Sequence, residues 1–212
     1  MIFRQSGFPH TVFRTVIRTA ILPVWLAVLA GCSQTSQEVD EPVTNGPEQI
    51  AAMFYRLLEA NPVPGLPGDD ALRVFRALFN QSLLHELQSA TAAQNRWLAS
   101  STPNPPLWQG SPFVSASEGM DSFTLVGCKT GRRTSQCTVD LQVEARGIRH
   151  AWQDVIHLRY GRLGWQIVDI DYGGDWPGSA HGQLGKRLTD FVEAAPPAPV
   201  IPVDPVHHGG RA

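Results

Sequence analysis

The chain has 212 residues, and its 17 basic and 19 acidic side chains give a formal net charge of −2 at pH 7. The basic residues form no continuous block, so this composition argues against a nucleic acid as partner. The length is sufficient for one domain with a substantial hydrophobic core.

The first 31 residues have the order of a secretory signal. Three arginines precede the uncharged apolar run AILPVWLAVLA at 20–30. A membrane-spanning helix takes about 20 apolar residues, so this run is too short for one. It ends in Leu29-Ala30-Gly31-Cys32, which resembles the lipobox of bacterial lipoproteins. We therefore predict a lipoprotein signal peptide over 1–31 and lipidation of Cys32; ordinary cleavage near Ala30, leaving Cys32 unmodified, is the alternative.

The lipobox resemblance also predicts the location. Lipoproteins of this kind carry three acyl chains on the new terminal cysteine, and each buried methylene contributes about 0.8 kcal/mol, so the chains together anchor the protein firmly. Ser33 follows the cysteine in place of an aspartate, which in enteric-type bacteria favours the outer membrane. We expect a cell-envelope protein held by its lipid at the periplasmic face of the outer membrane. Removal of 1–31 leaves 14 basic and 19 acidic residues, a net charge of −5.

Three further segments are predicted after the signal peptide. Residues 32–46 are polar and contain no aromatic side chain, as is typical of a flexible tether. Residues 195–212 contain five prolines, which predicts a disordered tail. A single folded domain is expected over 47–194.

The domain reads as helices followed by strands. Apolar residues recur at helical spacing over 47–60, from Asp69 to Phe79, and over about 81–98. Asp69 and Asn80 can cap the second and third helices. After a loop at 101–112, the β-branched and apolar runs predict strands over 123–128, 137–145, 151–160 and 165–172, and a last helix is predicted over about 180–193. Short connections imply antiparallel neighbours, so the expected class is α+β, with three N-terminal helices packed on a curved antiparallel sheet.

Two further cysteines lie on adjacent predicted strands. A turn centred between Arg132 and Arg133 places Cys128 opposite Cys137. Opposed residues of an antiparallel pair can form a disulfide, which an oxidising compartment preserves. The same register places Val126 opposite Val139 and Thr124 opposite Leu141. No Cys-x-x-Cys motif and no neighbouring histidine accompany the pair, so we predict a structural disulfide.

The best candidate for a ligand pocket lies in the last hairpin, residues 151–176. If Tyr160 faces Trp165 across its turn, one face of the hairpin carries three carboxylates beside apolar residues. The predicted pocket residues are Trp152, Asp154, Trp165, Asp169 and Asp171. Gathered carboxylates repel, so one of them could have a raised pKa and act as an acid or base, or together they could hold calcium. Alternatively, they are half-exposed and paired with arginines, or a one-residue slip separates Asp154 from the other two.

No catalytic, metal or cofactor motif stands out elsewhere. No histidine pair has the His-x-x-x-His spacing of a zinc-binding helix, and no Gly-x-Ser-x-Gly elbow is present. We therefore predict no catalytic residue, no metal ligand and no cofactor, and leave an enzymatic activity open but unfavoured.

Several motifs together resemble a known family. The segments PPLWQGSPFVSASEGMDSF, AWQDVIHLRYGRLGWQIVDIDYGGDW and GQLGKRL resemble bacterial lipoproteins of the domain-of-unknown-function 3828 family over roughly residues 47–192. The resemblance implies a cone-like fold similar to the ketosteroid isomerase and nuclear transport factor superfamily, in which three helices wrap a curved sheet. Members of that superfamily bind ligands, scaffold or transfer protons, so the fold does not choose a function. The enzymes use an aspartate base and a tyrosine or acid donor, whereas Asp169 and Tyr172 here have opposite parity on one predicted strand.

These observations favour a non-enzymatic interaction module, anchored to the membrane by its lipid, with an envelope protein as partner. The first alternative is a cone that binds a small ligand and has weak isomerase or hydrolase activity. The second is an immunity protein that blocks an envelope toxin.

Overall fold

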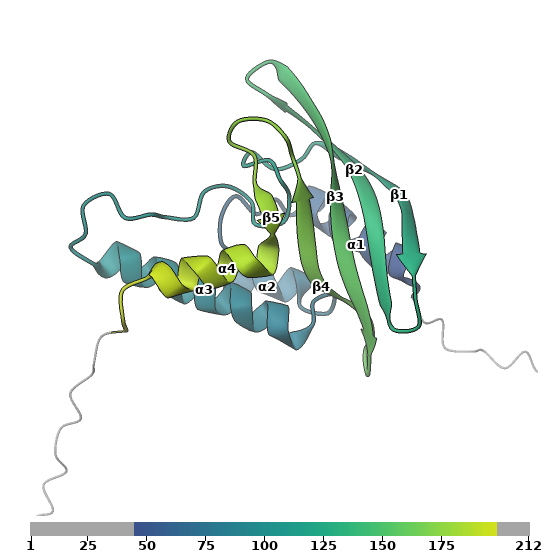
Figure 1. The fold of residues 1–212 in the computed structure, drawn as a ribbon, viewed down its shortest axis with the longest axis horizontal. Helices are drawn as coiled ribbons and strands as arrows, with labels where there is room; N and C mark the ends of the chain where they lie inside the picture. The colour runs from purple at the N-terminus through teal and green to yellow at the C-terminus, as the bar shows by residue number, and fades with distance from the viewer. Residues whose placement is uncertain (1–44, 199–212) are drawn as a thin grey trace, which may run out of the picture. The chain divides into compact units, whose positions relative to one another are not determined.

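The computed structural model describes residues 45–198, all within one compact unit. The predicted signal peptide at 1–31, Cys32, most of the tether at 32–46 and residues 199–212 of the predicted tail lie outside the described residues. The described part is α+β, with four helices and a five-stranded antiparallel sheet (Figure 1). The fold class expected from the sequence is confirmed at this level. None of the described helices is both long and apolar enough to span a bilayer.

The elements follow one another with short connections. The helices are α1 (Pro47–Ala60), α2 (Asp69–Phe75), α3 (Gln81–Ala99) and α4 (Leu184–Ala194). The strands are β1 (Ser122–Thr130), β2 (Thr134–Ala145), β3 (Ile148–Gly161), β4 (Gly164–Gly173) and β5 (His181–Gln183). The strands lie in chain order across the sheet, so each pairs with its neighbour in sequence.

Two predicted helix boundaries are wrong because residues there pair with β4. The second helix ends at Phe75, and Phe79 forms an isolated bridge with Ile167, in which the Ile167 N–H donates to Leu78 O at 2.7 Å. Before α4, residues 181–183 form β5 on the other part of the same β4 edge. Tertiary hydrogen bonds therefore shortened both helices.

The start of α3 and the end of α4 are held by specific side chains. Asn80 caps α3 as predicted, since its side-chain oxygen accepts from the Leu83 N–H at 2.9 Å. Beyond α4, the Arg96 Nε donates to Pro196 O at 2.7 Å. The first residues of the predicted tail therefore contact α3.

Four phenylalanines form the centre of the core. The ring centroids of Phe54, Phe75, Phe79 and Phe113 lie 5.4 to 6.0 Å apart in every pair. All four are essentially buried, and they belong to the same apolar cluster as the inward side chains of β2, β3 and β4. Contact between aromatic rings at such distances adds to the free energy of burial. Side chains of the helices and of the sheet thus pack together in one apolar core.

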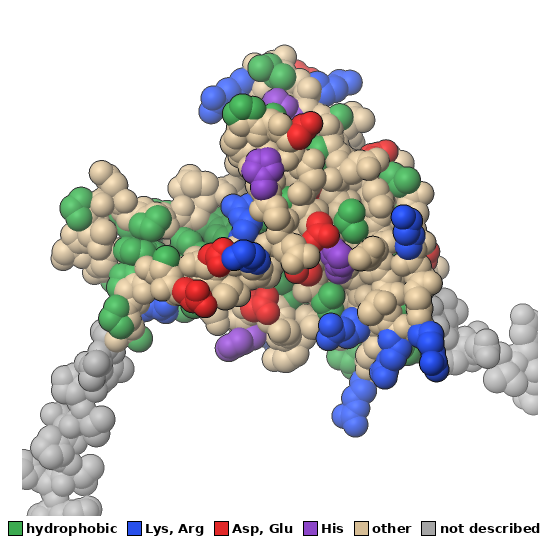
Figure 2. All heavy atoms as spheres, in the orientation of Figure 1, with side chains coloured by type: hydrophobic (Ala, Val, Ile, Leu, Met, Phe, Trp, Pro, Cys, Tyr) green, Lys and Arg blue, Asp and Glu red, His purple; other side chains and the backbone are tan. Residues whose placement is uncertain are grey.

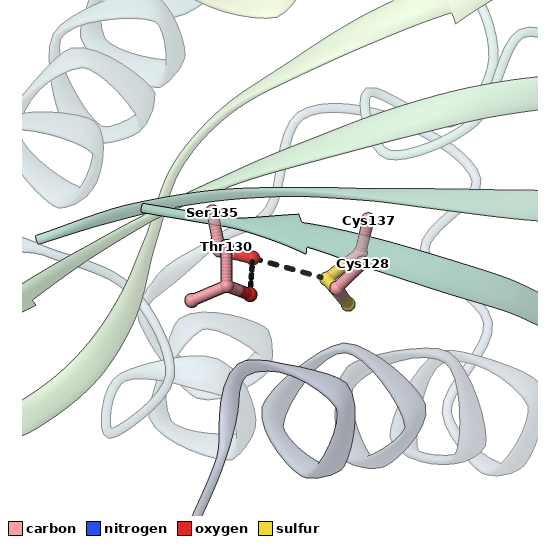
Figure 3. The surroundings of a disulfide bond; sticks show 4 residues. All are labelled: Cys128, Thr130, Ser135 and Cys137. Carbon is pink, nitrogen blue, oxygen red and sulfur yellow. Dashed lines mark hydrogen bonds between the residues drawn. A yellow bond between two sulfur atoms is a disulfide. The ribbon is translucent and has the colours of Figure 1, made fainter. Parts of the chain in front are cut away.

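Cys128 and Cys137 are bonded, as the sequence predicted. They face each other in the β1–β2 register with Cα atoms 4.0 Å apart. Figure 3 shows the bond beside Thr130 and Ser135, whose hydroxyl oxygens lie 2.8 Å apart. Cys137 is fully buried, so the disulfide ties β1 to β2 at the edge of the core.

The predicted β1–β2 register is wrong beyond the cysteines. A bulge at Val126 shifts the pairing, so Leu125 rather than Val126 faces Val139, and Thr124 faces Asp140 rather than Leu141. The bulge directs both Leu125 and Cys128 toward the core and leaves Val126 57% exposed. Leu125 and Cys128 are three positions apart, so strict alternation along β1 could bury only one of them.

Reduction of this disulfide is expected to lower the free energy of unfolding by about 2.5 to 3 kcal/mol, because the open chain regains the entropy of a short loop. Urea denaturation of the oxidised and reduced protein measures the difference. A variant with both cysteines replaced by alanine provides the control, since reductant should not change its stability. A protein equally stable in both redox states would contradict the prediction.

Candidate functional site

The β3–β4 hairpin determines where the predicted pocket residues lie. Tyr160 faces Trp165 as expected, but a bulge follows Ile167, after which His157 faces Asp169. The extra residue in β4, Val168, allows Ile167 and Ile170 both to be fully buried.

The prediction of three carboxylates on one face is therefore wrong. Asp171 faces Val155, which alternates with Asp154 along β3, so Asp169 and Asp171 lie on the side of the sheet opposite Asp154. The bulge reverses the alternation of β4 between the turn and the aspartates. The alternative considered from the sequence, a one-residue shift that separates Asp154 from Asp169 and Asp171, is the arrangement found.

Asp154 lies at the centre of a buried hydrogen-bond network. Its Oδ1 accepts from Ser115 Oγ at 2.5 Å and from the Gly173 N–H at 2.9 Å, and its Oδ2 accepts from the Ser115 N–H at 3.0 Å. Ser115 Oγ in turn accepts from the Gly174 N–H at 3.0 Å. We call these four residues the Asp154 node. It joins β3 to the loop before β1 and to the end of β4.

The two glycines of the node are required by close packing. A Cβ atom on Gly173 would lie 1.9 Å from the carbonyl oxygen of Gln153, and one on Gly174 would lie 2.8 Å from the Ser115 Cβ. Only residues without a side chain let the end of β4 approach Asp154 this closely. The sequence motifs contained Ser115 and both glycines, but alternation alone assigned them no role.

Burial dominates the electrostatics of this interior. It raises the pKa of the Asp154 carboxyl, and the hydrogen bonds from Ser115 and Gly173 offset only part of that effect. Burial, together with the nearby Asp154, also raises the pKa of Tyr55 well above its usual value. The Tyr172 hydroxyl donates to Pro112 O at 2.6 Å. Both Asp154 oxygens are committed to protein donors, so the geometry is that of a structural carboxylate.

Asp169 and Asp171 have separate partners. Asp169 Oδ1 accepts from the Gly185 N–H at 2.9 Å in the first turn of α4, where a negative charge is favourable. Asp171 Oδ2 lies 2.7 Å from His157 Nε2, and its Oδ1 accepts from Gln183 Nε2 at 2.8 Å. The arginine partners considered from the sequence are therefore wrong. The His157 pairing was missed because the bulge that permits it leaves no local signal.

The two tryptophans of the predicted pocket lie at opposite ends of the hairpin. Trp152 is 6% exposed and its ring centroid lies 5.2 Å from that of Trp176. Trp165 packs against Tyr160 beside the turn, with centroids 5.4 Å apart. The five predicted residues thus line no common pocket.

A hollow of about 440 Å³ lies instead at the β2–β3 end of the sheet. His150 stacks on Trp176 there with centroids 4.7 Å apart, and Ile148 at the hairpin is 60% exposed. We call this site the tip hollow; its lining residues are Ser117, Glu118, Ala145, Arg146, Ile148, His150, Trp176, Pro177 and Gly178. Sequence reasoning missed it because it unites three segments distant in the chain.

Charge in the tip hollow is mixed. The hydrogen bond from Ser117 Oγ, 2.8 Å long, lowers the pKa of Glu118, and Arg146 and His150 lower it further. The site therefore combines an aromatic surface with charges of both signs. Such a composition suits contact with a protein surface.

No metal centre forms within residues 45–198, where no three His, Cys, Asp or Glu side chains gather closely enough to hold an ion. The calcium alternative required Asp154 beside Asp169 and Asp171, which the register separates.

No family model matches the chain, and no curated protein or solved structure matches it either. The resemblance to the domain-of-unknown-function 3828 lipoproteins therefore rests on the quoted motifs alone.

Proposed function

We propose that this protein is a lipid-anchored accessory module of the bacterial cell envelope, which binds another envelope protein and catalyses no reaction. The observation that supports this function best is the state of its interior. Phe54 and Phe113 are fully buried in the phenylalanine cluster, and Asp154, which a proton-transfer reaction would need free, is fully buried with both oxygens hydrogen-bonded. A small-ligand cone has less support, because a ligand would have to displace these contacts.

The finer fold belongs to this proposal. We infer a cone-like arrangement in which the helices wrap the curved sheet. Contacts of α1 with β1, β2 and β4, and of α3 and α4 with β4, support it. The bulges in β1 and β4 support it as well, since bulges bend a strand and increase its twist.

The tip hollow is the surface that we assign to the partner. Its Trp176 is partly buried against the core, and Ile148 beside it is 60% exposed. Tryptophan and arginine, both present here, are enriched among residues that dominate binding energies. Contact with a partner would cover the exposed isoleucine.

Site-specific photocrosslinking in cells tests the partner surface. A photoreactive residue at Ile148 should give one discrete adduct with an envelope protein, and Trp176→Ala should abolish it because the aromatic surface is lost. Leu98, which is also 60% exposed but lies on α3, is the matched control and should give no such adduct. No adduct at Ile148, or the same adduct from both positions, would overturn the assignment.

Mass spectrometry of the processed protein tests the anchor separately. We expect a product that begins at Cys32 and carries the mass of its acyl chains. An unmodified Cys32 thiol would overturn the lipoprotein part of the proposal.

A further inference from the structure

Five basic side chains gather at one end of the sheet. Two turns lie side by side there, because the Tyr160 N–H of β3 donates to Arg133 O of the β1–β2 turn at 2.9 Å. We call the set the basic end; it comprises Lys129, Arg132, Arg133, Arg159 and Arg162, all exposed. Figure 2 shows basic side chains clustered in the lower part of the view, over the β1–β2 and β3–β4 turns.

The two turns of the basic end carry charged side chains of one sign only. Residues 129–136 and 159–165 contain no aspartate or glutamate, and within 45–198 none of the five basic residues belongs to an ion pair. The chain as a whole is slightly acidic, so this positive charge is a local feature. At the opposite end, by contrast, Arg149 faces Glu144 across the β2–β3 pair.

The chain enters the domain at the same end. Tyr55 in α1 stacks on Phe123 at the start of β1, and Leu58, three residues later in α1, lines the same hollow as Met120, which precedes β1. Residue numbers thus rise along α1 as they fall along β1, so the two elements run in opposite directions. The helix α1 therefore begins toward the end of the sheet that holds the β1–β2 turn (Figure 1). Fourteen residues separate Cys32 from Pro47, and a chain of that length reaches about 50 Å at most.

An exposed apolar residue stands among these cations. Leu163, at the tip of the β3–β4 turn, follows Arg162 directly and is 82% exposed. Tyr160, 37% exposed, packs against Trp165 next to this turn. Basic residues beside an apolar side chain and interfacial aromatics are typical of surfaces that contact lipid headgroups.

We propose that the basic end docks on the anionic phospholipid headgroups of the leaflet that holds the anchor, an inference that rests on the proposed lipid-anchored function. Each arginine or lysine near an anionic surface strengthens binding several-fold, and Leu163 enters the headgroup layer. Docking leaves the tip hollow, at the other end of β3, facing away from the bilayer. A lipid anchor alone would not fix the orientation of the domain relative to the bilayer.

Vesicle flotation tests the docking without the lipid anchor. The processed chain from residue 32 onward, carrying Cys32→Ser, should float with phosphatidylglycerol vesicles but not with phosphatidylcholine vesicles, and high salt should release it. Arg133→Gln with Arg162→Gln should weaken binding about 30-fold. Arg73→Gln with Arg149→Gln removes the same charge outside both the basic end and the tip hollow, and should leave binding nearly unchanged.

The outcomes separate the two proposals. Absence of binding to the anionic vesicles, equal binding to both lipids, or equal loss in the two double variants would overturn docking by the basic end. Circular dichroism of each variant shows that it is folded. The anchor itself is judged by the mass of the processed protein, so docking can fail while the anchor stands, and the reverse.

Discussion

Replacement of Asp154 by alanine is expected to lower the free energy of unfolding by about 2 to 6 kcal/mol. The variant would leave the N–H groups of Ser115 and Gly173 buried without acceptors, and each such group is costly. It would also release the loop before β1 from β3. Chemical denaturation at neutral pH, followed by tryptophan fluorescence, measures the loss.

Asp140→Ala is the matched control for this variant. Asp140 lies on β2 and accepts one exposed hydrogen bond, 2.7 Å long, from Gln153 Nε2. Its loss should change the free energy of unfolding by less than about 1 kcal/mol. Equal effects at the two aspartates would show that the Asp154 node does not contribute special stability.

The same carboxyl should make stability depend on pH. Burial raises the folded-state pKa of Asp154 above its unfolded value of about 3.9. The stability that the group contributes is therefore complete below the unfolded pKa and is lost as pH rises through the folded pKa. The unfolding free energy of the wild type minus that of Asp154→Asn should accordingly fall from acid to neutral pH. A constant or rising difference would contradict the raised pKa.

Replacement of Gly173 by alanine is expected to lower the free energy of unfolding by about 3 kcal/mol or more. The added Cβ would lie 1.9 Å from Gln153 O, a backbone atom that cannot move without separating β3 from β4. Such a shift would also lengthen the hydrogen bond from the Gly173 N–H to Asp154. The effect therefore combines steric overlap with partial loss of the node.

Gly161→Ala is the control for this glycine. Gly161 ends β3 in the same hairpin, and a Cβ there would meet no atom within 4 Å. The free energy of unfolding of this variant should differ from that of the wild type by less than about 1 kcal/mol. If denaturant midpoints showed both variants unchanged, close packing at Gly173 would not be what selects glycine there.

The register errors in the two hairpins share one cause. The sequence predicted the residue pairs nearest the turns, Cys128 with Cys137 and Tyr160 with Trp165, because turn length determines them. Farther from the turns, each hairpin contains a bulge that no local pattern announced. A bulge forms where burying two side chains on one face outweighs an interrupted ladder, and that balance depends on the core.

The Asp154 node and the two proposed surfaces depended even more on tertiary contacts. Ser115 belongs to a loop 39 residues from Asp154 in the chain, and the tip hollow joins Glu118, Ile148 and Trp176 from three segments. The basic end likewise arises because two turns about 30 residues apart lie together. Residue spacing along the chain does not predict such contacts between segments that are distant in the sequence.

The amino-acid pattern by itself determined the α+β class, α1 from Pro47 to Ala60, the Asn80 cap and the cysteine pairing, since each of these depends on neighbours a few residues away. Only the tertiary structure decided that Asp154 is buried while Asp169 and Asp171 face the other side. The physical reason is the one extra residue in β4, which lets Ile167 and Ile170 both reach the core. That residue moves the side chains beyond it to the opposite face of the sheet from the one that strict alternation predicts.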